Sequence, residues 1–481
     1  MRLPARTAPA TRAHTVSRLT LAFVLALPAA VVSSTTTAVP AQASHACPAS
    51  RLAPRVGRPV VDVRFHVSPG KTTVYGKQHI SFAPDLATSH VVLRQWANMP
   101  DYKAAGGWGR ISKITISGAV SRTYYPADTR STITSLTLPR TLRAGEHIRI
   151  SMAFTTRLPS RGAERLGNDG TTAWWGSGHP MLAWEQGVGW ATEPAGTLWG
   201  ERTTSEAFLL RTLIVRARTS DVVLATGSKY KSVLVADGRR DHYFTAPSVR
   251  DVMVAVGPLR TTTRTVGSTR LVVAAPPNVA DSVHAVADTF ARSLNAHSAR
   301  FGSPFPYPNL SVAVLPRLGG GIEFPGGIMM GSGEYRDATA THEVAHEYFY
   351  GLVGNNQGRD PWLDEAFATY AEALHRGTSS TYLDAWIPSD GYRRVGQPMS
   401  YWETRQSSYY RSVYVQGARA LLEARKADGN PVAFDNAIRC YVRAQAHRIA
   451  RPSLLARHLE HLPKARAKLV FWGALPAQYA P

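Results

Sequence analysis

The sequence predicts a chain with two folded domains, an all-β domain followed by a mixed α and β domain that ends in helices. Strand-like runs separated by short turns fill residues 58–262, where helical periodicity is scarce. From residue 263 onward, strand patterns alternate with helical stretches, and the end of the chain has the periodicity of helices. The length of 481 residues suits two or three domains.

Residues 1–43 are predicted to be a secretory signal peptide. Four arginines and no acidic residue precede an apolar run that extends from residue 19 to about residue 32, and Ala41-Gln42-Ala43 has the pattern of a cleavage site. The apolar run is short for a helix that spans a bilayer, so an uncleaved anchor is the less favoured alternative. We therefore expect a secreted, extracellular protein in which residues 44–57 form a linker.

The first domain is expected to be a β sandwich or saddle. Residues 60–67 alternate in part between apolar and polar side chains, and the runs 73–76 and 79–82 continue this pattern after short turns. The aromatic-rich residues 174–199 are expected to belong mainly to the core.

The second domain, residues 263–481, is expected to open with strands near 271–274 and 310–314 on either side of a helical stretch at 278–301. A glycine-rich segment follows at 319–326. The apolar residues 327–330 are predicted to be an edge strand beside a cleft, and helices follow them.

The net charge of +22 comes from 55 Lys and Arg against 33 Asp and Glu. No basic run is longer than a pair, so the excess of positive charge looks dispersed along the chain. Nucleic-acid binding would favour a clustered basic stripe on a known module, and we expect no nucleic-acid partner. Loose association with anionic cell-surface polymers is the expected consequence of the charge.

The chain has two cysteines, Cys47 and Cys440. An even pair in an exported chain allows one disulfide, which we predict between these two residues. Two free thiols are the alternative.

Residues 342–346, His-Glu-Val-Ala-His, carry the clearest chemical signal. Two histidines four residues apart share one face of a helix and can both reach a zinc ion, while Glu343 is placed to act on water. Eighteen residues separate His346 from Glu365, which lies in a second helix that is expected to start at Asp360-Pro361 with Asp360 as its N-cap. His342, His346 and Glu365 would form a His₂Glu set with one open position, the mark of a catalytic zinc. One Zn²⁺ per chain is therefore predicted.

With these residues in view, the chain resembles the M1 family of zinc aminopeptidases, the gluzincins, as a short secreted member of bacterial type. The resemblance rests on residues 342–346, on Gly-Asn-Asn-Gln at 354–357 and on Trp-Leu-Asp-Glu at 362–365. It implies a thermolysin-like α+β catalytic domain after the β domain.

Two further motifs of that family have counterparts here. The segment Gly320-Gly321-Ile322-Glu323-Phe324 resembles the family's Gly-x-Met-Glu-Asn strand, with Ile and Phe in place of Met and Asn. The resemblance implies that Glu323 binds the substrate's α-amino group, and glycines such as Gly320 and Gly321 suit close approach of a ligand to the backbone. Tyr414, in Tyr-Val-Gln-Gly-Ala, resembles the family's transition-state tyrosine.

Each of these residues also has an ordinary structural interpretation. Glu323 could be a solvated loop carboxylate, and Tyr414 could be a core tyrosine bonded to the backbone. Asp364 could be a charge at a helix N-terminus or could orient a zinc ligand.

The hypothesis from sequence is a secreted zinc-dependent aminopeptidase that hydrolyses peptides from their N-terminus with metal-activated water. One alternative is a zinc endopeptidase of thermolysin type. An alternative of another class is an inactive secreted binding protein on a peptidase scaffold.

Overall fold

The computed structural model describes residues 47–125, 131–160, 164–193, 198, 206–316, 318–333 and 336–481. The predicted signal peptide lies outside these residues, while residues 45–481 cluster as one compact unit. No helix in the described part of the chain is long and apolar enough to span a membrane.

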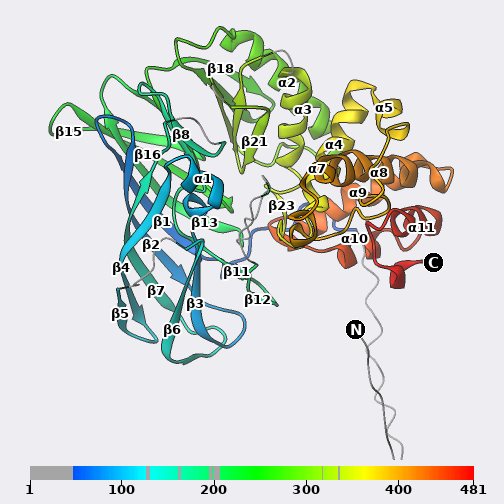
Figure 1. Cartoon of the computed structure of the whole chain (residues 1–481), viewed down its shortest axis with the longest axis horizontal. Helices are drawn as coiled ribbons and strands as arrows, with labels where there is room; N and C mark the ends of the chain where they lie inside the picture. Colours follow the sequence, from blue (N-terminus) through cyan, green and yellow to red (C-terminus); the bar gives the residue numbers. More distant parts are fainter. Residues whose placement is uncertain are drawn as a thin grey trace, which may run out of the picture. The chain divides into compact units, whose positions relative to one another are not determined.

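The first half of this unit is built from β-sheets, of which the largest has eight strands (Figure 1). Its strands alternate between buried and open side chains, so one face packs on the core and the other faces outward. The strand order is β15 (Ser228–Val235), β16 (Arg239–Val249), β13 (Phe208–Arg218), β1 (Val60–Val67), β2 (Thr73–Phe82), β7 (Ile148–Arg157), β4 (Trp108–Gly118) and β5 (Arg122–Tyr124).

Smaller sheets accompany the large one. A three-stranded sheet consists of β10 (Met181–Leu182), β3 (Thr88–Arg94) and β6 (Ile133–Leu142). A two-stranded sheet consists of β11 (Trp184–Glu185) and β12 (Gly189–Trp190). A four-stranded sheet consists of β14 (Val222–Ala225), β17 (Met253–Gly257), β9 (Ala173–Gly176) and β8 (Leu166–Asn168). Two short helical segments are η1 (Trp96–Asn98) and α1 (Pro100–Ala104). The predicted fold class, a β domain followed by an α-rich region, is confirmed.

A five-stranded sheet opens the second half. Its order is β18 (Arg260–Val266), β19 (Thr269–Ala275), β20 (Asn309–Leu315), β22 (Gly327–Gly331) and β21 (Gly321–Phe324). The predicted domain boundary at residue 262 falls within β18 and stays a prediction. The prediction of an edge strand at 327–330 was wrong, because β22 is buried on both faces between β20 and β21. A continuous apolar run is the pattern of an interior strand, and the edge belongs to β21.

Helices cover the rest of the chain, together with the small parallel pair β23 (Val353–Asn355) and β24 (Arg448–Ala450). They are α2 (Val283–Phe301), α3 (Arg336–His346), α4 (Trp362–Arg376), α5 (Ser379–Leu383), α6 (Met399–Trp402), α7 (Gln406–Tyr409), the π-helix η2 (Tyr410–Val415), α8 (Gln416–Ala427), α9 (Pro431–Gln445), α10 (Pro452–His458), α11 (Pro463–Phe471) and the 3₁₀ turn η3 (Ala477–Tyr479).

The start of α4 differs from the prediction. Pro361 occupies the N-cap position and no side chain caps the helix, so Asp360 is not the N-cap. Asp360 is instead buried, and this burial raises the pKa of its carboxyl group to about 7. A carboxyl whose pKa is raised in this way is a poorer cap, because an N-cap accepts hydrogen bonds best as a carboxylate.

The edge strand β21 is fixed by contact with the four-stranded sheet. Phe324 is fully buried in an apolar cluster with Trp174 and Met253. Its ring lies so close to the backbone of Gly176 in β9 that a Cβ at this glycine would overlap the ring. The β half of the molecule therefore supports the strand that carries Glu323.

The predicted Cys47–Cys440 disulfide was wrong. Both cysteines are free thiols, Cys47 exposed and Cys440 buried. Burial and a hydrogen bond with Cys47 raise the pKa of the Cys440 thiol to about 12, so the thiol stays protonated. Sequence could not decide this, because bonding depends on a sulfur separation that the spacing of two residues does not report.

Candidate metal centre

Helix α3 presents two histidines on one face and ends at the second of them. His342 and His346 lie one turn apart, with ring centroids separated by 4.8 Å. From α4, Glu365 reaches both of them, and its Oε2 lies 3.3 Å from Nε2 of each imidazole. The ligand atoms of the three residues all lie within 4.8 Å of one another. The structure thus brings the three predicted metal ligands together.

These three side chains fit a zinc ion. Two imidazole nitrogens and one carboxylate oxygen are the donor set of a catalytic zinc, and they leave one position open. A second group, Glu323, Glu343 and His346, is equally compact. Its two carboxylates and single imidazole match zinc less well, and it shares His346 with the first group. We take His342, His346 and Glu365 as the candidate centre.

Electrostatics at the centre favour a bound cation. Burial lowers the pKa of His342, but the carboxylates of Glu365 and Glu372 outweigh this effect and hold the pKa well above its usual value. Burial raises the pKa of Glu365, but the charges and hydrogen bonds of His346 and His342 hold it far below the ordinary value. The surplus of negative charge therefore stabilises positive charge here, as protons or as a metal ion.

Each imidazole is oriented through its second nitrogen. Nδ1 of His342 lies 3.6 Å from Oε2 of Glu372, whose other oxygen accepts hydrogen bonds from Arg376 and Tyr382. Nδ1 of His346 lies 3.2 Å from the carbonyl oxygen of Phe349. Such partners fix the ring orientation, so that Nε2 points toward the metal position.

The backbone that supplies the Phe349 carbonyl is strained. The next residue, Tyr350, has φ of 125° and is almost fully buried. Non-glycine residues adopt such a conformation only when the surroundings enforce it, and they do so most often near functional sites. Here the hydrogen bond from the Tyr350 amide to the Val353 carbonyl, 2.8 Å long, closes the turn behind His346.

Glu343 projects toward the edge strand rather than toward the metal ligands of α4. It is buried, and its carboxyl packs against the backbone of Gly321. A Cβ at Gly321 would lie 2.5 Å from Oε1 and Cγ of Glu343. The neighbouring Gly320 has φ of 83°, which favours glycine. The two glycines therefore let the strand approach the carboxylate closely.

Glu323 lies on β21, directly beside this group. It is 3% exposed, and its Oε1 lies 3.4 Å from Nε2 of Gln357. The same amide nitrogen donates a 3.0 Å hydrogen bond to Asp364, which also accepts the backbone N–H of Glu365 at 2.8 Å. The Asp364 carboxylate thus contacts the metal ligand Glu365 through the backbone N–H of Glu365. Gln357 links the strand that carries Glu323 to the helix that carries Glu365.

Solved structures with the same architecture include M1 zinc metallopeptidases. An M1 zinc metallopeptidase from Deinococcus radiodurans matches with a TM-score of 0.63 and 21% identity over 89% of this chain and 97% of that chain. The chain has the fold of the M1 zinc metallopeptidases. A variant of the Deinococcus enzyme bound to a Tyr-Ser-Ala substrate matches at 0.63 and 20% identity over 88% and 94% of the two chains. A two-domain M1 zinc metallopeptidase variant bound to L-tryptophan matches at 0.63 and 20% identity over 89% and 98%. No protein-family model matches the chain.

In this M1-type fold, the candidate centre opens into a cavity of about 390 Å³. Among the described residues that line it are five glutamates and neither lysine nor arginine. Three of these glutamates are Glu323, Glu343 and Glu365, and Glu372 is the fourth. The fifth, Glu164, comes from the β half, just before β8. The cavity is therefore acidic although the whole protein is strongly basic.

Tyr414 also lines this cavity and lies in the π-helix η2. Its hydroxyl donates a 2.5 Å hydrogen bond to Oε1 of Glu365, and its ring stacks on His342 with centroids 5.9 Å apart. The α-helix α8 begins two residues after Tyr414. A π-helical turn has a different angular spacing from an α-helix, and such turns are frequent at functional sites. Tyr410, on the preceding turn, also lines the cavity.

Sequence reasoning missed Glu372, Gln357 and Glu164. A signal existed for Glu372, because it lies two helical turns after Glu365 and so shares its face. Glu164 lines the cavity and Gln357 contacts Glu323 and Asp364, both from loops whose course the sequence does not report. Their roles follow only from the packing of the two halves.

The approach of Gly321 to Glu343 yields a test. We expect Gly321→Ala to displace the Glu343 carboxylate and to lower kcat about 100-fold, because a shift of about 1 Å at a reacting group costs that much. Zinc content, measured by atomic absorption, should stay unchanged because no ligand moves. Gly319→Ala is the matched control, since a Cβ there meets no atom within 4 Å. Equal effects of the two substitutions on kcat would contradict the proposed packing constraint.

Proposed function

We propose that this chain is a zinc-dependent aminopeptidase of the M1 type, which removes single residues from the N-terminus of peptides. The observation that carries the proposal is the buried carboxylate of Glu323, close to both Glu343 and His346. A carboxylate at this place would pair with the ammonium group of a peptide's first residue. That pairing would set the cut one residue from the end. A substrate peptide and free L-tryptophan in the neighbouring structures support this substrate class.

Proton transfer falls to Glu343. His342, His346 and Glu365 would hold the zinc ion, which would supply polarisation of the scissile carbonyl and a water molecule of lowered pKa. Glu343 accepts the proton of that water and delivers it to the leaving amine. Its burial against Gly321 keeps the carboxylate in one position between the two steps.

Tyr414 is the candidate donor to the developing oxyanion. Its hydroxyl is bonded to Glu365 in this structure, so it has to turn toward the substrate's carbonyl oxygen when a peptide binds. A donor in such a place is worth roughly 2.7–4 kcal/mol of transition-state stabilisation. The half-buried ring, stacked on His342, limits that motion to a small arc.

The acidic cavity suits a substrate that carries a free ammonium group. A lining with five glutamates attracts a positive chain end and disfavours a peptide carboxylate near the centre. Charge-assisted hydrogen bonds of this kind are about twice as strong as neutral ones. The electrostatics of the cavity thus act in the same direction as Glu323.

Two other functions account for fewer of the residues in the site than the aminopeptidase does. A thermolysin-type endopeptidase would use the same zinc chemistry, but it has no use for a carboxylate where the peptide must continue past the site. An inactive binding protein on a peptidase scaffold would need neither Glu343 nor Tyr414 beside the three ligands. Association with anionic cell-surface polymers has no support from the comparisons and stays a prediction from net charge.

The role of Glu323 is tested with free and blocked substrates. We expect Glu323→Ala to lower kcat/KM for free-amine dipeptide amides about 100-fold, because the loss of the ion pair also loses the register of the scissile bond. Glu323→Gln, which keeps the shape and removes the charge, should behave similarly. Zinc content should match that of the wild type. N-acetylation of the substrate should mimic the substitution in the wild-type enzyme. Rapid internal cleavage of acetylated peptides by the wild type would instead establish the endopeptidase.

We propose too that the protein is exported. Its mature form should begin near Ser44, because the small-x-small site at residues 41–43 is the expected point of cleavage. Intact mass and N-terminal sequencing of protein secreted by its host measure this directly. A mature chain that keeps residues 2–18 would refute the signal-peptide interpretation.

A further inference from the structure

The open face of the eight-stranded sheet is strongly basic. Its strands contain fourteen Lys and Arg but only two Asp, a net charge of +12 out of +22 for the whole chain. Strand alternation buries the apolar side chains and turns eleven of these cations outward, while Arg122, Lys229 and Arg240 are in register with buried residues on the other face. The positive charge is therefore concentrated on one face, although it looks dispersed in the sequence.

Internal ion pairs neutralise only a small part of this charge. The two acidic residues of the sheet are both engaged, Asp62 by a two-pronged contact with Arg211 and Asp241 by a two-pronged contact with Arg216. Arg64 lies 3.5 Å from the same Asp241. The remaining cations have no acidic partner within the sheet.

Two pairs of like charges face each other directly across neighbouring strands. Arg64 of β1 is in register with Lys77 of β2, and Arg218 of β13 with Arg239 of β16. Like charges directly opposite each other destabilise a sheet. The side-chain ammonium group of Lys77 makes no hydrogen bond or ion pair with any described residue. A bound anion would lower a repulsion of this kind further.

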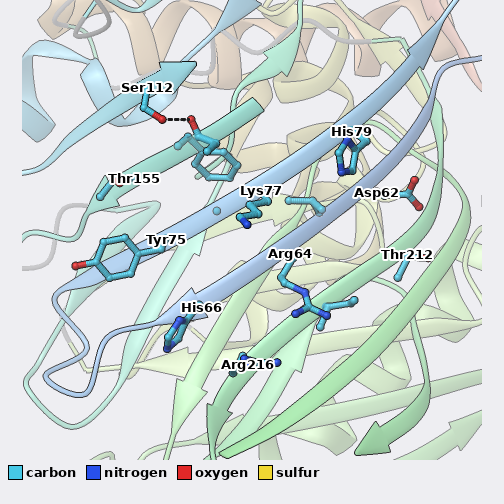
Figure 2. A pocket seen from close by; sticks show the side chains of 15 residues that line it. Asp62, Arg64, His66, Tyr75, Lys77, His79, Ser112, Thr155, Thr212 and Arg216 are labelled. Carbon is cyan, nitrogen blue, oxygen red and sulfur yellow. Dashed lines mark hydrogen bonds between the residues drawn. The ribbon is translucent and has the colours of Figure 1, made fainter. Parts of the chain in front are cut away.

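The same face holds a trough of about 610 Å³ that shares no residue with the candidate metal centre. Figure 2 shows the side chains of Lys77, Arg64 and Arg216 on three neighbouring strands, with His66 and His79 between and beside them. The hollow exists because its β7 lining, Ala153 and Thr155, has short outward side chains opposite Lys77 and Tyr75.

Two histidines of the trough, His66 and His79, have lowered pKa values. Burial, and then the charges of Arg239 and Arg216, lower the pKa of His66. Burial and the charge of Arg149 lower the pKa of His79. Burial is the larger cause in both cases, and the arginine charges that add to it agree with the excess of cations on this face.

We propose that this trough binds a single linear polyanion that carries phosphate groups, with Arg64, Lys77 and Arg216 as its principal contacts. Guanidinium groups bind phosphate oxygens in pairs, and lysine binds them as a point charge. Strands about 4.8 Å apart present one cation each, which suits closely spaced phosphates along one chain. A flat bilayer cannot enter the trough. A nucleic acid strand would need stacking surfaces for its bases, and the lining offers one exposed tyrosine, Tyr75.

The experiment uses the whole zinc-loaded protein and short-chain inorganic polyphosphate as the probe, titrated by calorimetry at several NaCl concentrations. The test variant is Lys77→Gln with Arg64→Gln, which leaves Asp241 paired with Arg216. The matched control is Lys103→Gln with Arg457→Gln, which removes the same charge from exposed sites outside the sheet.

We expect wild-type protein to bind polyphosphate and the test variant to bind it about tenfold more weakly or worse. The slope of log affinity against log salt should fall by about 1.4 in magnitude, because each lost phosphate contact on a single chain removes about 0.7. The control should change affinity less than about twofold.

Three results would overturn the proposal: no binding of polyphosphate by the wild type, equal weakening in the test and control variants, or tighter binding of single-stranded DNA or anionic vesicles through Arg64 and Lys77. If the double variant unfolds, the single substitution Lys77→Gln carries the test, since Lys77 has no partner to lose among the described residues.

Discussion

The meeting of one carboxylate with two imidazoles organises the catalytic half of this molecule. Oε2 of Glu365 lies 3.3 Å from both histidines, so α3 and α4 must pack in one register. Apolar contacts hold that register, above all the stacked rings of Phe349 and Phe367, whose centroids lie 4.4 Å apart. Burying these charges costs several kcal/mol each, and the packing of the aromatic core offsets this cost. Three further side chains contact these helices. Glu372 contacts His342, Gln357 donates a hydrogen bond to Asp364, and Tyr414 donates one to Glu365.

Charge of opposite sign is separated within the compact unit. The cavity at the centre is lined by glutamates, whereas the open face of the eight-stranded sheet carries a large excess of positive charge. Fields of opposite sign at two places allow one protein to attract an ammonium group at one site and an anion at another. The β half therefore has two tasks in this account: it supports β21 through Phe324, and it presents the basic trough.

What could be predicted from sequence was what depends on local geometry. The spacing of four residues fixes His342 and His346 on one helix face, and the strand and helix patterns predict the order of the two halves. The sequence failed where tertiary packing decides. The apolar run at 327–330 became an interior strand, Asp360 became a buried acid with a raised pKa rather than a cap, and Tyr414 lies in a π-helix. The basic face of the sheet could not be predicted from the sequence for the same reason. Its charges alternate with core residues on strands far apart in the chain, so no run of them appears.

The central claim is that His342, His346 and Glu365 hold zinc while Glu343 moves the proton. It is tested most directly by zinc content and turnover measured together in two variants. The account predicts that Glu365→Gln loses the metal, whereas Glu343→Gln keeps one zinc per chain and loses about 100- to 10,000-fold in turnover. The opposite result, with metal lost from Glu343→Gln and retained in Glu365→Gln, would place the ion among Glu323, Glu343 and His346 and contradict the account.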